Sequence, residues 1–354
     1  MTAEEIFRFE KKELLPIDKE FPFACIGLAH SHIYGMTNSL ISAGATLRWV
    51  YDDDASAVEA FAKKYPDVKI ARSIDEVLSD KSVMLVASAD IPSRRASLAI
   101  NCMRSGHNFF VDKAPAVTLS ECDEIERCQR ETGMKYFVYY SELIENDAAI
   151  FARDLIKRGA LGRLYNMEIV APHRLNAPTR PDWFWKKALT GGILTDIGSH
   201  QIEQFLEFSD CAEAKITNAT VNNFFHPEYP EFEDFGCATI ESKNGIKGYI
   251  RVDWMSPDGI KAFGDLRLTL LCEKGYIELR KNCDIGRSDK GNNVFVVTND
   301  GVYSDCVSGK VQKTYFNKLI HDCLEGSDTA MNKDFVYSAM RLTVEAQMMA
   351  DKNR

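Results

Sequence analysis

The sequence has 354 residues, a length typical of two domains. Apolar residues make up 45% of the chain and charged residues 27%, which excludes a disordered or fibrous protein. The 43 Lys and Arg against 52 Asp and Glu give a formal net charge of −9. An acidic surface repels phosphate backbones and anionic lipid, so we expect neither a nucleic-acid nor a membrane partner.

The ten cysteines include no Cys-x-x-Cys pair and no His/Cys cluster at zinc spacing. The amino-terminal stretch is charged and lacks the apolar centre of a signal peptide. No apolar run approaches the ~20 residues that a bilayer crossing requires. These patterns predict a cytoplasmic protein with reduced thiols.

The first part of the chain alternates short apolar runs with amphipathic segments. The apolar runs are Phe23–Gly27, Leu47–Tyr51, Val83–Ala87, Phe109–Val111 and Tyr136–Tyr139. The helical segments between them include Ala55–Lys64, Arg94–Ser105 and Leu119–Thr132. This alternation predicts a parallel sheet covered on both faces, because each crossover helix must bury its apolar stripe. We expect a doubly wound α/β (Rossmann) domain over residues 21–141.

After a predicted helix at 147–158 the pattern changes. Residues 214–225, 233–242, 245–254 and 265–280 are β-rich, and hairpin signals such as Asn244-Gly245 separate them. Strands joined by hairpins are antiparallel, so residues 142–354 should form an α+β domain with a large, mostly antiparallel sheet. We expect this domain to bind substrate and to mediate oligomerisation. Two final helices, near 314–324 and 334–351, could pack on either domain.

The loop after the first apolar run has the spacing of a dinucleotide-binding turn, in which glycines let the backbone approach a diphosphate. Gly27 holds the first glycine position, Ala29 the second and His32 the third, with His30 between them. The loop alone is equally compatible with an ordinary strand-to-helix turn. On the dinucleotide interpretation, these four residues border the cofactor.

Asp52 follows the second apolar run, 25 positions after Gly27. A carboxylate there accepts both ribose hydroxyls of NAD and repels the 2′-phosphate of NADP. The alternative for Asp52–Asp54 is a helix cap with a solvated acidic first turn. We expect Asp54 to cap the helix and Asp52 to bind ribose, so NAD is the predicted cofactor and NADP the less favoured one.

His30 and His32 also form a His-x-His pair that could hold a metal. Two histidines without a third ligand nearby in the sequence more often line a pocket or cap a helix. We therefore predict no metal site.

Two clusters carry candidate catalytic residues. Lys113 follows the strand expected at 109–111, at the edge where ligands bind in parallel sheets, although a solvated surface lysine is the simpler explanation. Asp196 and His200 follow Gly191-Gly192 and would share one helix face at i and i+4. Such a pair could orient a hydroxyl and remove its proton, or it could merely hold a domain interface.

Four motifs together resemble one family. They are Asp112-Lys113-Ala114-Pro115, the Gly-Gly-x-Leu-x-Asp-x-Gly-x-His run that ends at His200, Gly159-Ala160-Leu161-Gly162, and Glu233-Asp234-Phe235. Over about Phe23–Asp351 the chain resembles the glucose-fructose oxidoreductase/inositol dehydrogenase/MocA (Gfo/Idh/MocA) family of NAD(P)-dependent oxidoreductases. The resemblance implies a nicotinamide in a cleft between two domains. It also implies that Lys113 bonds the reacting hydroxyl, Asp196 orients the substrate and His200 is the general acid/base.

The chain departs from the family pattern at several positions. His32 replaces the third glycine, and the proline after Lys113 is displaced by one place. Ser88-Ala89-Asp90 stands where the family often has Thr-Pro-Asn, and Ser88 and Asp90 are expected beside the cofactor.

The stretch His173–Lys186 precedes the Gly-Gly run and should border the substrate. Trp183 could stack on the apolar face of a polyhydroxylated ring, while Arg174, Arg180 or Lys186 could instead hold a carboxylate. One of Trp183 and Trp185 could equally be a core aromatic. A sugar, a cyclitol and a sugar acid all remain open as substrates.

The open face of the antiparallel sheet predicts a homodimer or homotetramer, because an exposed apolar face is usually covered by a second copy. Three functions fit the pattern: a polyol or sugar dehydrogenase, an NAD-retaining enzyme that catalyses a redox-neutral elimination or glycoside cleavage, and a non-enzymatic NAD(H) sensor. The joint presence of Lys113, Asp196 and His200 argues against the sensor and favours the dehydrogenase.

Overall fold

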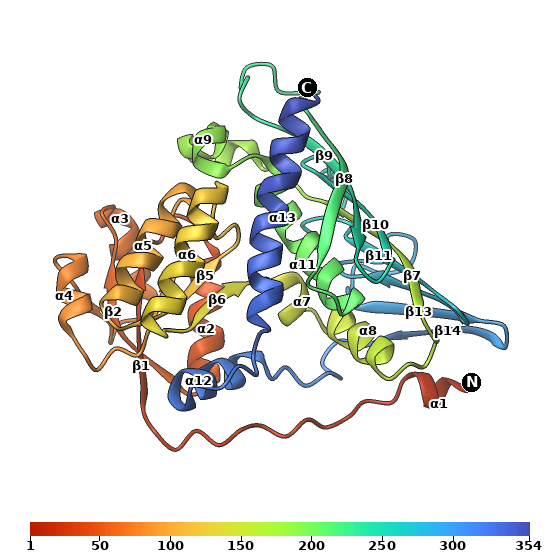
Figure 1. Cartoon of the computed structure of the whole chain (residues 1–354), viewed down its shortest axis with the longest axis horizontal. Helices are drawn as coiled ribbons and strands as arrows, with labels where there is room; N and C mark the ends of the chain where they lie inside the picture. The colour runs from red at the N-terminus through yellow and green to blue at the C-terminus, as the bar shows by residue number, and fades with distance from the viewer. The chain divides into compact units, whose positions relative to one another are not determined.

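The computed structural model describes residues 1–354, and the chain forms two compact units (Figure 1). The parallel-sheet unit contains Glu13–Tyr139 and Thr314–Tyr337. The antiparallel-sheet unit contains Met1–Lys12, Tyr140–Lys313 and Ser338–Arg354. None of the helices combines the length and the apolar character that a bilayer crossing needs.

The parallel-sheet unit contains one six-stranded sheet in the order β3-β2-β1-β4-β5-β6, with every neighbouring pair parallel. The strands are β1 (Phe21–Ile26), β2 (Ala45–Tyr51), β3 (Lys69–Ile70), β4 (Leu85–Ser88), β5 (Asn108–Asp112) and β6 (Tyr136–Tyr139). The predicted doubly wound sheet is thus confirmed. The strand order reverses between β1 and β4, so the loops after β1, β4 and β5 gather at one edge, where such sheets bind ligands.

Two helices of this unit, at 55–64 and 119–132, have the predicted bounds, and those predicted at 94–105 and 314–324 are shifted by one or two residues. The helices of the unit are α2 (His32–Ser42), α3 (Ala55–Lys64), α4 (Ile74–Ser79), α5 (Pro92–Arg104), α6 (Leu119–Thr132) and α12 (Tyr315–Glu325). Asp54 caps α3, as predicted, by accepting from the backbone N–H groups of Ser56 and Ala57. On α12, Phe316 lies 5.8 Å from the ring of Phe110 on β5, so this late helix packs on the parallel sheet.

The antiparallel-sheet unit contains an eight-stranded sheet in the order β14-β13-β12-β11-β7-β10-β9-β8. The strands are β7 (Leu164–Pro172), β8 (Ala214–Asn222), β9 (Phe235–Ser242), β10 (Lys247–Asp253), β11 (Arg267–Cys272), β12 (Gly275–Arg280), β13 (Asn293–Thr298) and β14 (Gly301–Cys306). All neighbouring pairs are antiparallel except β7 with β10, which confirms the large, mostly antiparallel sheet. Three strands, β7, β13 and β14, were not predicted.

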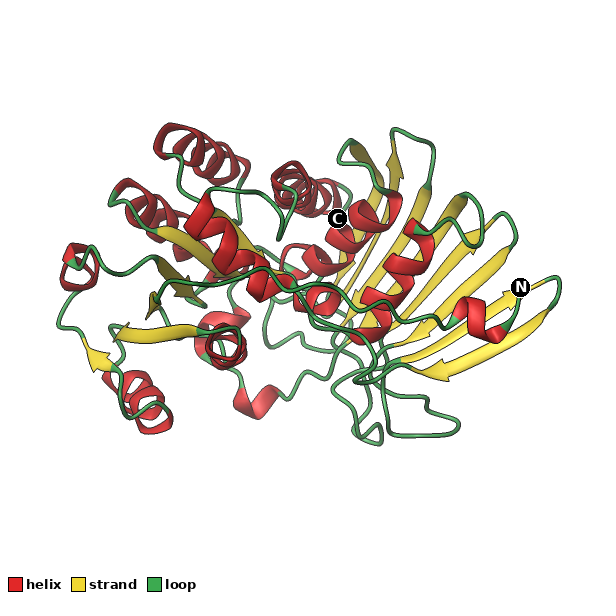
Figure 2. Ribbon diagram, turned by 90° about the horizontal axis from the view of Figure 1, so that it is seen from below, coloured by secondary structure: helices red, strands yellow, loops and turns green.

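One face of this sheet is covered by helices, as Figure 2 shows. The helices of the unit are α1 (Ala3–Ile6), α7 (Ser141–Ile144), α8 (Asp147–Lys157), α9 (Lys187–Thr190), α10 (Ile193–Asp196), α11 (Gly198–Ser209) and most of α13 (Lys333–Lys352), with short 3₁₀ turns at Ala177–Thr179 and Asp182–Trp185. Helix α11 packs on β7, β9 and β10, and α8 packs on β12 and β13. Along β9 and β10 inward and outward residues alternate, so the opposite face is open.

Candidate active site

The turn between β1 and α2 requires a glycine at its first position. Gly27 has φ +82°, and a Cβ there would lie 2.5 Å from Cβ of Asp90. Its N–H donates to the carbonyl of Tyr51 at 3.0 Å, and its own carbonyl accepts from the N–H of Ala89 at 3.0 Å. The loop that holds Ala29 and His30 is therefore fixed to the ends of β2 and β4.

Asp52, which follows β2, makes the next set of hydrogen bonds at this edge of the parallel sheet. Its Oδ2 accepts from the N–H of Leu28 at 2.6 Å, and its Oδ1 accepts from the N–H of Asp54 at 2.8 Å. Beside it lies an open groove of about 770 Å³, whose lining includes Tyr51, Asp52, Asp53, Val58, Ile70 and Ala71. The groove combines apolar side chains with charged ones of both signs, Lys63 and Arg72 included, and its place after β2 fits the adenosine part of a dinucleotide.

Ser88 and Asp90 lie at the end of β4, against Gly27. Asp90 donates from its N–H to Oγ of Ser88 at 3.3 Å, and its Oδ1 accepts from the N–H of Ile91 at 2.6 Å. Burial raises the pKa of the Asp90 carboxyl. This shift favours the neutral acid, which is the form that least repels a diphosphate.

His30 and His32 meet the carboxylate of Asp112, 80 residues later in the chain. His32 Nδ1 lies 2.8 Å from Asp112 Oδ1, and His30 Nδ1 lies 3.4 Å from Asp112 Oδ2. Asp112 is fully buried (0% exposed), which by itself disfavours its charge, but His32, Arg95 and His30 hold its pKa far below the usual range. His32 Nδ1 therefore carries the proton and donates to an ionised carboxylate.

Arg95, which the sequence analysis did not single out, organises this edge from α5. Its side chain is 1% exposed, and Nη2 donates to Asp112 Oδ2 at 3.2 Å. Nη1 donates to the carbonyls of Asp112, Lys113 and Ala114. The guanidinium thus fixes the backbone around Lys113, and no local pattern in α5 announces this role.

The ligand atoms of His30, His32 and Asp112 lie within 4.8 Å of one another, close enough for a metal ion to bridge them. Oδ2 of Asp112 is already bonded to Arg95, and Oδ1 accepts both from His32 and from the N–H of Lys113 at 2.8 Å. A divalent cation would also meet the positive charges of Arg95 and Lys113. We therefore interpret the group as a carboxylate–imidazole network rather than as a metal site.

Lys113 immediately follows β5 and is 8% exposed. The peptide bond between Lys113 and Ala114 is cis. Lys113 belongs to the parallel-sheet unit and follows a strand at the edge of the sheet where ligands bind. Asp196 and His200 belong to the antiparallel-sheet unit.

In the antiparallel-sheet unit, Gly191 and Gly192 immediately precede the short helix α10. Gly192 has φ +91°, and a Cβ there would lie 2.5 Å from the side-chain amide of Gln347 on α13. Gln347 Oε1 accepts from the N–H of Leu194 at 3.1 Å, and Glu233 Oε2 accepts from that of Ile193 at 3.0 Å. These two side chains satisfy the first N–H groups of α10, a role that the sequence did not reveal.

Asp196 and His200 do not share one uninterrupted helix. Asp196 ends α10, a turn at Ile197 follows, and His200 lies in the first turn of α11. The predicted i and i+4 pair is therefore carried by two consecutive helices, with His200 only 3% exposed.

Glu142, on α7, provides a buried negative charge beside His200. Its Oε2 accepts from Nε2 of Gln201 at 2.8 Å and lies 3.4 Å from Nζ of Lys281, while Oε1 lies 3.8 Å from Nε2 of His173. Burial opposes its ionisation, but His200, Lys281 and His173 lower the pKa of Glu142 to about 2. Glu142 could not be recognised from the sequence, because no motif surrounds it.

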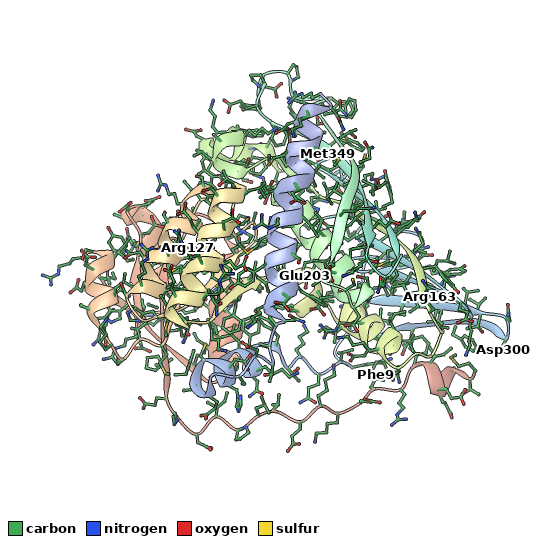
Figure 3. The ribbon with its side chains drawn as sticks, viewed as in Figure 1. Phe9, Arg127, Arg163, Glu203, Asp300 and Met349 are labelled. Carbon is green, nitrogen blue, oxygen red and sulfur yellow. The ribbon has the colours of Figure 1, made fainter.

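A second buried acid, Glu203, lies on α11 and is labelled in Figure 3. Burial and the neighbouring carboxylate of Glu207 raise the pKa of Glu203 well above its usual value. The surroundings of these two acids on neighbouring helices therefore act in opposite directions, favouring the charged form of Glu142 and disfavouring that of Glu203.

The predicted substrate residues divide into two groups. Arg180 stacks over the rings of Phe184 (4.5 Å) and Trp254 (4.7 Å), and the charge of Asp196 acts on it. Arg174 instead donates to the carbonyl of Ile260 and lies 3.6 Å from Asp258. The structure thus brings Arg180 to Asp196 and directs Arg174 to a loop.

The two tryptophans also differ. Trp183 is half-buried in the 3₁₀ turn Asp182–Trp185. Trp185 is buried and stacks on Tyr229 with ring centroids 3.8 Å apart. Trp185 is therefore the core aromatic that the sequence analysis left open.

The two units define a dinucleotide-binding Rossmann domain joined to an α+β domain with an open sheet. Residues 22–140 match the oxidoreductase family with an NAD-binding Rossmann fold, and residues 150–278 match the GFO/IDH/MocA C-terminal domain. The chain therefore belongs to the Gfo/Idh/MocA family of oxidoreductases, as its sequence motifs indicate.

A crystal structure of a candidate oxidoreductase from Erwinia carotovora atroseptica SCRI1043 is 42% identical, covers 94% of this chain and 99% of its own, and superposes with a TM-score of 0.92. An NADP⁺-dependent scyllo-inositol 2-dehydrogenase from Bacillus subtilis is 24% identical over 52% of this chain and 50% of its own length. An NAD⁺-dependent scyllo-inositol 2-dehydrogenase from the same organism is 25% identical over 72% of each chain. The chain thus spans about half the length of the first of these enzymes.

Proposed function

We propose that this protein is an NAD-dependent oxidoreductase that exchanges a hydride between nicotinamide and a secondary alcohol of a sugar, cyclitol or sugar acid. The observation that carries the proposal is His200, a buried imidazole that interacts electrostatically with the buried carboxylate of Glu142. A carboxylate in this position stabilises the imidazolium that forms when His200 accepts a proton.

The residues of this chain supply the proton chemistry and the orientation. His200 accepts the hydroxyl proton of the alcohol and returns it in the reverse direction. Lys113 donates a hydrogen bond to the oxygen on which negative charge develops, and Asp196 holds the hydroxyl in place. The bound nicotinamide supplies the hydride-accepting carbon, and the protein supplies the geometry.

We propose NAD rather than NADP as the cofactor because of Asp52. Its carboxylate lines the groove beside β2, where it would accept ribose hydroxyls and repel an added phosphate. The curated relatives include one NADP⁺ enzyme and one NAD⁺ enzyme, so the choice rests on this residue.

For the substrate, the proposal of a polyhydroxylated ring is supported by the residues near Asp196 and by the relatives. Asp196 lines a small hollow with Phe184 and Trp254, and Arg180 stacks on both of these rings. Aromatic faces beside charged hydrogen-bonding groups suit a sugar or cyclitol. The two inositol dehydrogenases among the relatives act on a ligand of this chemistry.

The proposal includes a homodimer or homotetramer formed through the open face of the antiparallel sheet. On that face Leu271, Tyr276, Val297 and Val302 form one row across β11 to β14. Leu271, Tyr276 and Val302 are exposed, and a second copy would bury them. A cytoplasmic location also remains part of the proposal, and ten free cysteines fit a reducing compartment.

The test is a fluorescence titration of the full chain with NADH and with NADPH, followed by turnover assays on a panel of polyols, sugars and sugar acids. We expect saturable NADH binding, weaker NADPH binding, and nicotinamide reduction with at least one compound. If neither NADH nor NADPH binds, the proposed function is refuted. Binding with substrate turnover but without a net change in nicotinamide absorbance would refute the dehydrogenase assignment.

A further inference from the structure

The loop between β1 and α2 has lost most of the backbone donors that a glycine-rich loop offers to a diphosphate. The N–H of Leu28 donates to Asp52, that of His30 donates to the carbonyl of Ala89 at 2.8 Å, and that of His32 donates to Nδ1 of His30 at 3.2 Å. The first N–H of α2 is thus capped by an imidazole of the chain itself. A diphosphate at this helix end must find other donors or displace this cap.

The hydrogen bonds fix where the protons of the two imidazoles lie. His30 Nδ1 accepts from an N–H, so a neutral His30 carries its proton on Nε2. His32 carries a proton on Nδ1 and donates it to Asp112. A neutral His30 therefore uses its only free lone pair to cap the helix.

A protonated His30 would change this arrangement. Its Nδ1 could no longer accept from His32, but it lies 3.4 Å from Asp112 Oδ2, to which it could then donate. The N–H of His32 would become free for an anion, and Nε2–H of His30 could donate to the same anion. One proton on Nδ1 thus converts the capped helix end into a site with two donors.

The charges around His30 favour this change once an anion is bound. Burial and the positive charges of His32, Lys113 and Arg95 lower the pKa of His30 well below its usual value, with Asp112 opposing them. Of these groups, Asp112 ends β5, Lys113 follows it, Arg95 lies on α5 and His32 begins α2. Asp90 is the residue after Ala89, whose carbonyl accepts from the N–H of His30. A diphosphate supplies the negative charge that the free protein lacks here, and it therefore favours the imidazolium.

Resting on the proposed dinucleotide binding, we infer that His30 is a specificity-determining residue for the diphosphate. His30 binds the diphosphate by taking up a proton from solvent at Nδ1, and this protonation releases the N–H of His32. NADH binding is then linked to the uptake of a fraction of a proton, up to about one per chain. Affinity for NADH should rise roughly three- to tenfold between pH 8.0 and pH 6.5.

The experiment is calorimetric titration of the EDTA-treated full chain with NADH in two buffers of different ionisation enthalpy. The difference in apparent binding enthalpy gives the number of protons exchanged. His30→Asn keeps a side-chain oxygen that can accept from the N–H of His32 but cannot be protonated. We expect this variant to bind NADH with no proton uptake and with less than about a twofold change in affinity over the same pH range. His321→Asn, on α12 of the same unit, is the matched control and should keep the wild-type uptake.

ADP-ribose, which has the diphosphate but no nicotinamide, should reproduce the proton uptake. NADH binding without proton uptake, or equal uptake by wild type and His30→Asn, would overturn the inference and leave the proposed function standing. If neither NADH nor NADPH binds, this inference and the proposed function are both refuted. Stoichiometric Zn²⁺ binding that excludes NADH and is lost in His30→Asn would assign the ligand atoms of His30, His32 and Asp112 to a metal. That result would also overturn the inference.

Discussion

Arg95 Nη2 donates to Asp112 Oδ2 at 3.2 Å, and both side chains are almost completely buried. Helix α5 and strand β5 are thereby joined by an ion pair beneath Lys113. Removal of the guanidinium would leave Asp112 buried with the two imidazoles and the N–H of Lys113 as its partners. We expect Arg95→Met to reduce the free energy of unfolding by about 3–5 kcal/mol.

Denaturant unfolding measures this effect, and Arg104→Met in the exposed last turn of α5 is the control, with an expected change within about 0.5 kcal/mol. A loss below about 1 kcal/mol for Arg95→Met would mean that the imidazoles and the N–H of Lys113 suffice to stabilise the carboxylate.

Lys113→Met keeps the apolar stem and removes the ammonium group. If Lys113 stabilises the developing alkoxide, kcat falls by about 100-fold or more, while the Kd for NADH changes little. The exposed Lys274→Met is the control. Normal turnover by Lys113→Met would remove this residue from the proposed chemistry.

Glu142→Gln removes the negative charge beside His200 while keeping the shape of the side chain. For alcohol oxidation, the acidic limb of the kcat–pH profile should move to lower pH, because no carboxylate then favours the imidazolium. His200→Ala should abolish this limb and lower kcat by about 100-fold or more. An unshifted limb in Glu142→Gln would show that the carboxylate does not act on His200.

The same carboxylate predicts a pH dependence of stability. The pKa of Glu142 is lowered from 4.5 to about 2 in the folded protein, so its stabilising effect is present above its unfolded pKa. That effect is lost as pH falls from near 5 towards 2. Urea midpoints of wild type and Glu142→Gln should therefore differ at pH 7, differ less at pH 3, and converge only at about pH 2 or below, and a constant difference would contradict this assignment.

Asp52→Ala should weaken the preference for NADH over NADPH by roughly fivefold, the equivalent of about 1 kcal/mol of charge repulsion at a hydrated surface. Asp75→Ala, at an exposed acid in the first turn of α4 and outside the groove, is the control. Fluorescence titration with both dinucleotides gives the ratio, and an unchanged ratio would remove Asp52 from the ribose site.

Gly192→Ala tests how α10 is positioned. Both Gly192 and Gly159 have positive φ, but only at Gly192 would a Cβ collide with a neighbour, the amide of Gln347. We expect Gly192→Ala to cost about 1–3 kcal/mol more than Gly159→Ala in unfolding experiments. Equal costs would mean that Gln347 moves aside freely.

The local pattern of the sequence was sufficient for most of the secondary structure and for the two kinds of sheet. Helices α3 and α6 were predicted with their observed bounds, as was the cap at Asp54, because helical periodicity and capping depend on neighbouring residues. Strand β3 has two exposed residues and offers no such pattern.

The supporting residues of the candidate site could not be predicted in this way. Arg95 meets Asp112 because strand order places β4, β5 and α5 together, and Glu142 meets Lys281 across 139 residues of sequence. Gln347 likewise reaches the start of α10 from the last helix.

By itself, then, the sequence determined the alternation of strands and helices, the family motifs and the candidate residues Lys113, Asp196 and His200. Only the tertiary structure decided which charges surround them and which protonation states result. The physical reason is that periodicity is a short-range property of the chain. The field at a buried ionisable group instead sums over charges from distant segments that only folding brings within a few ångströms.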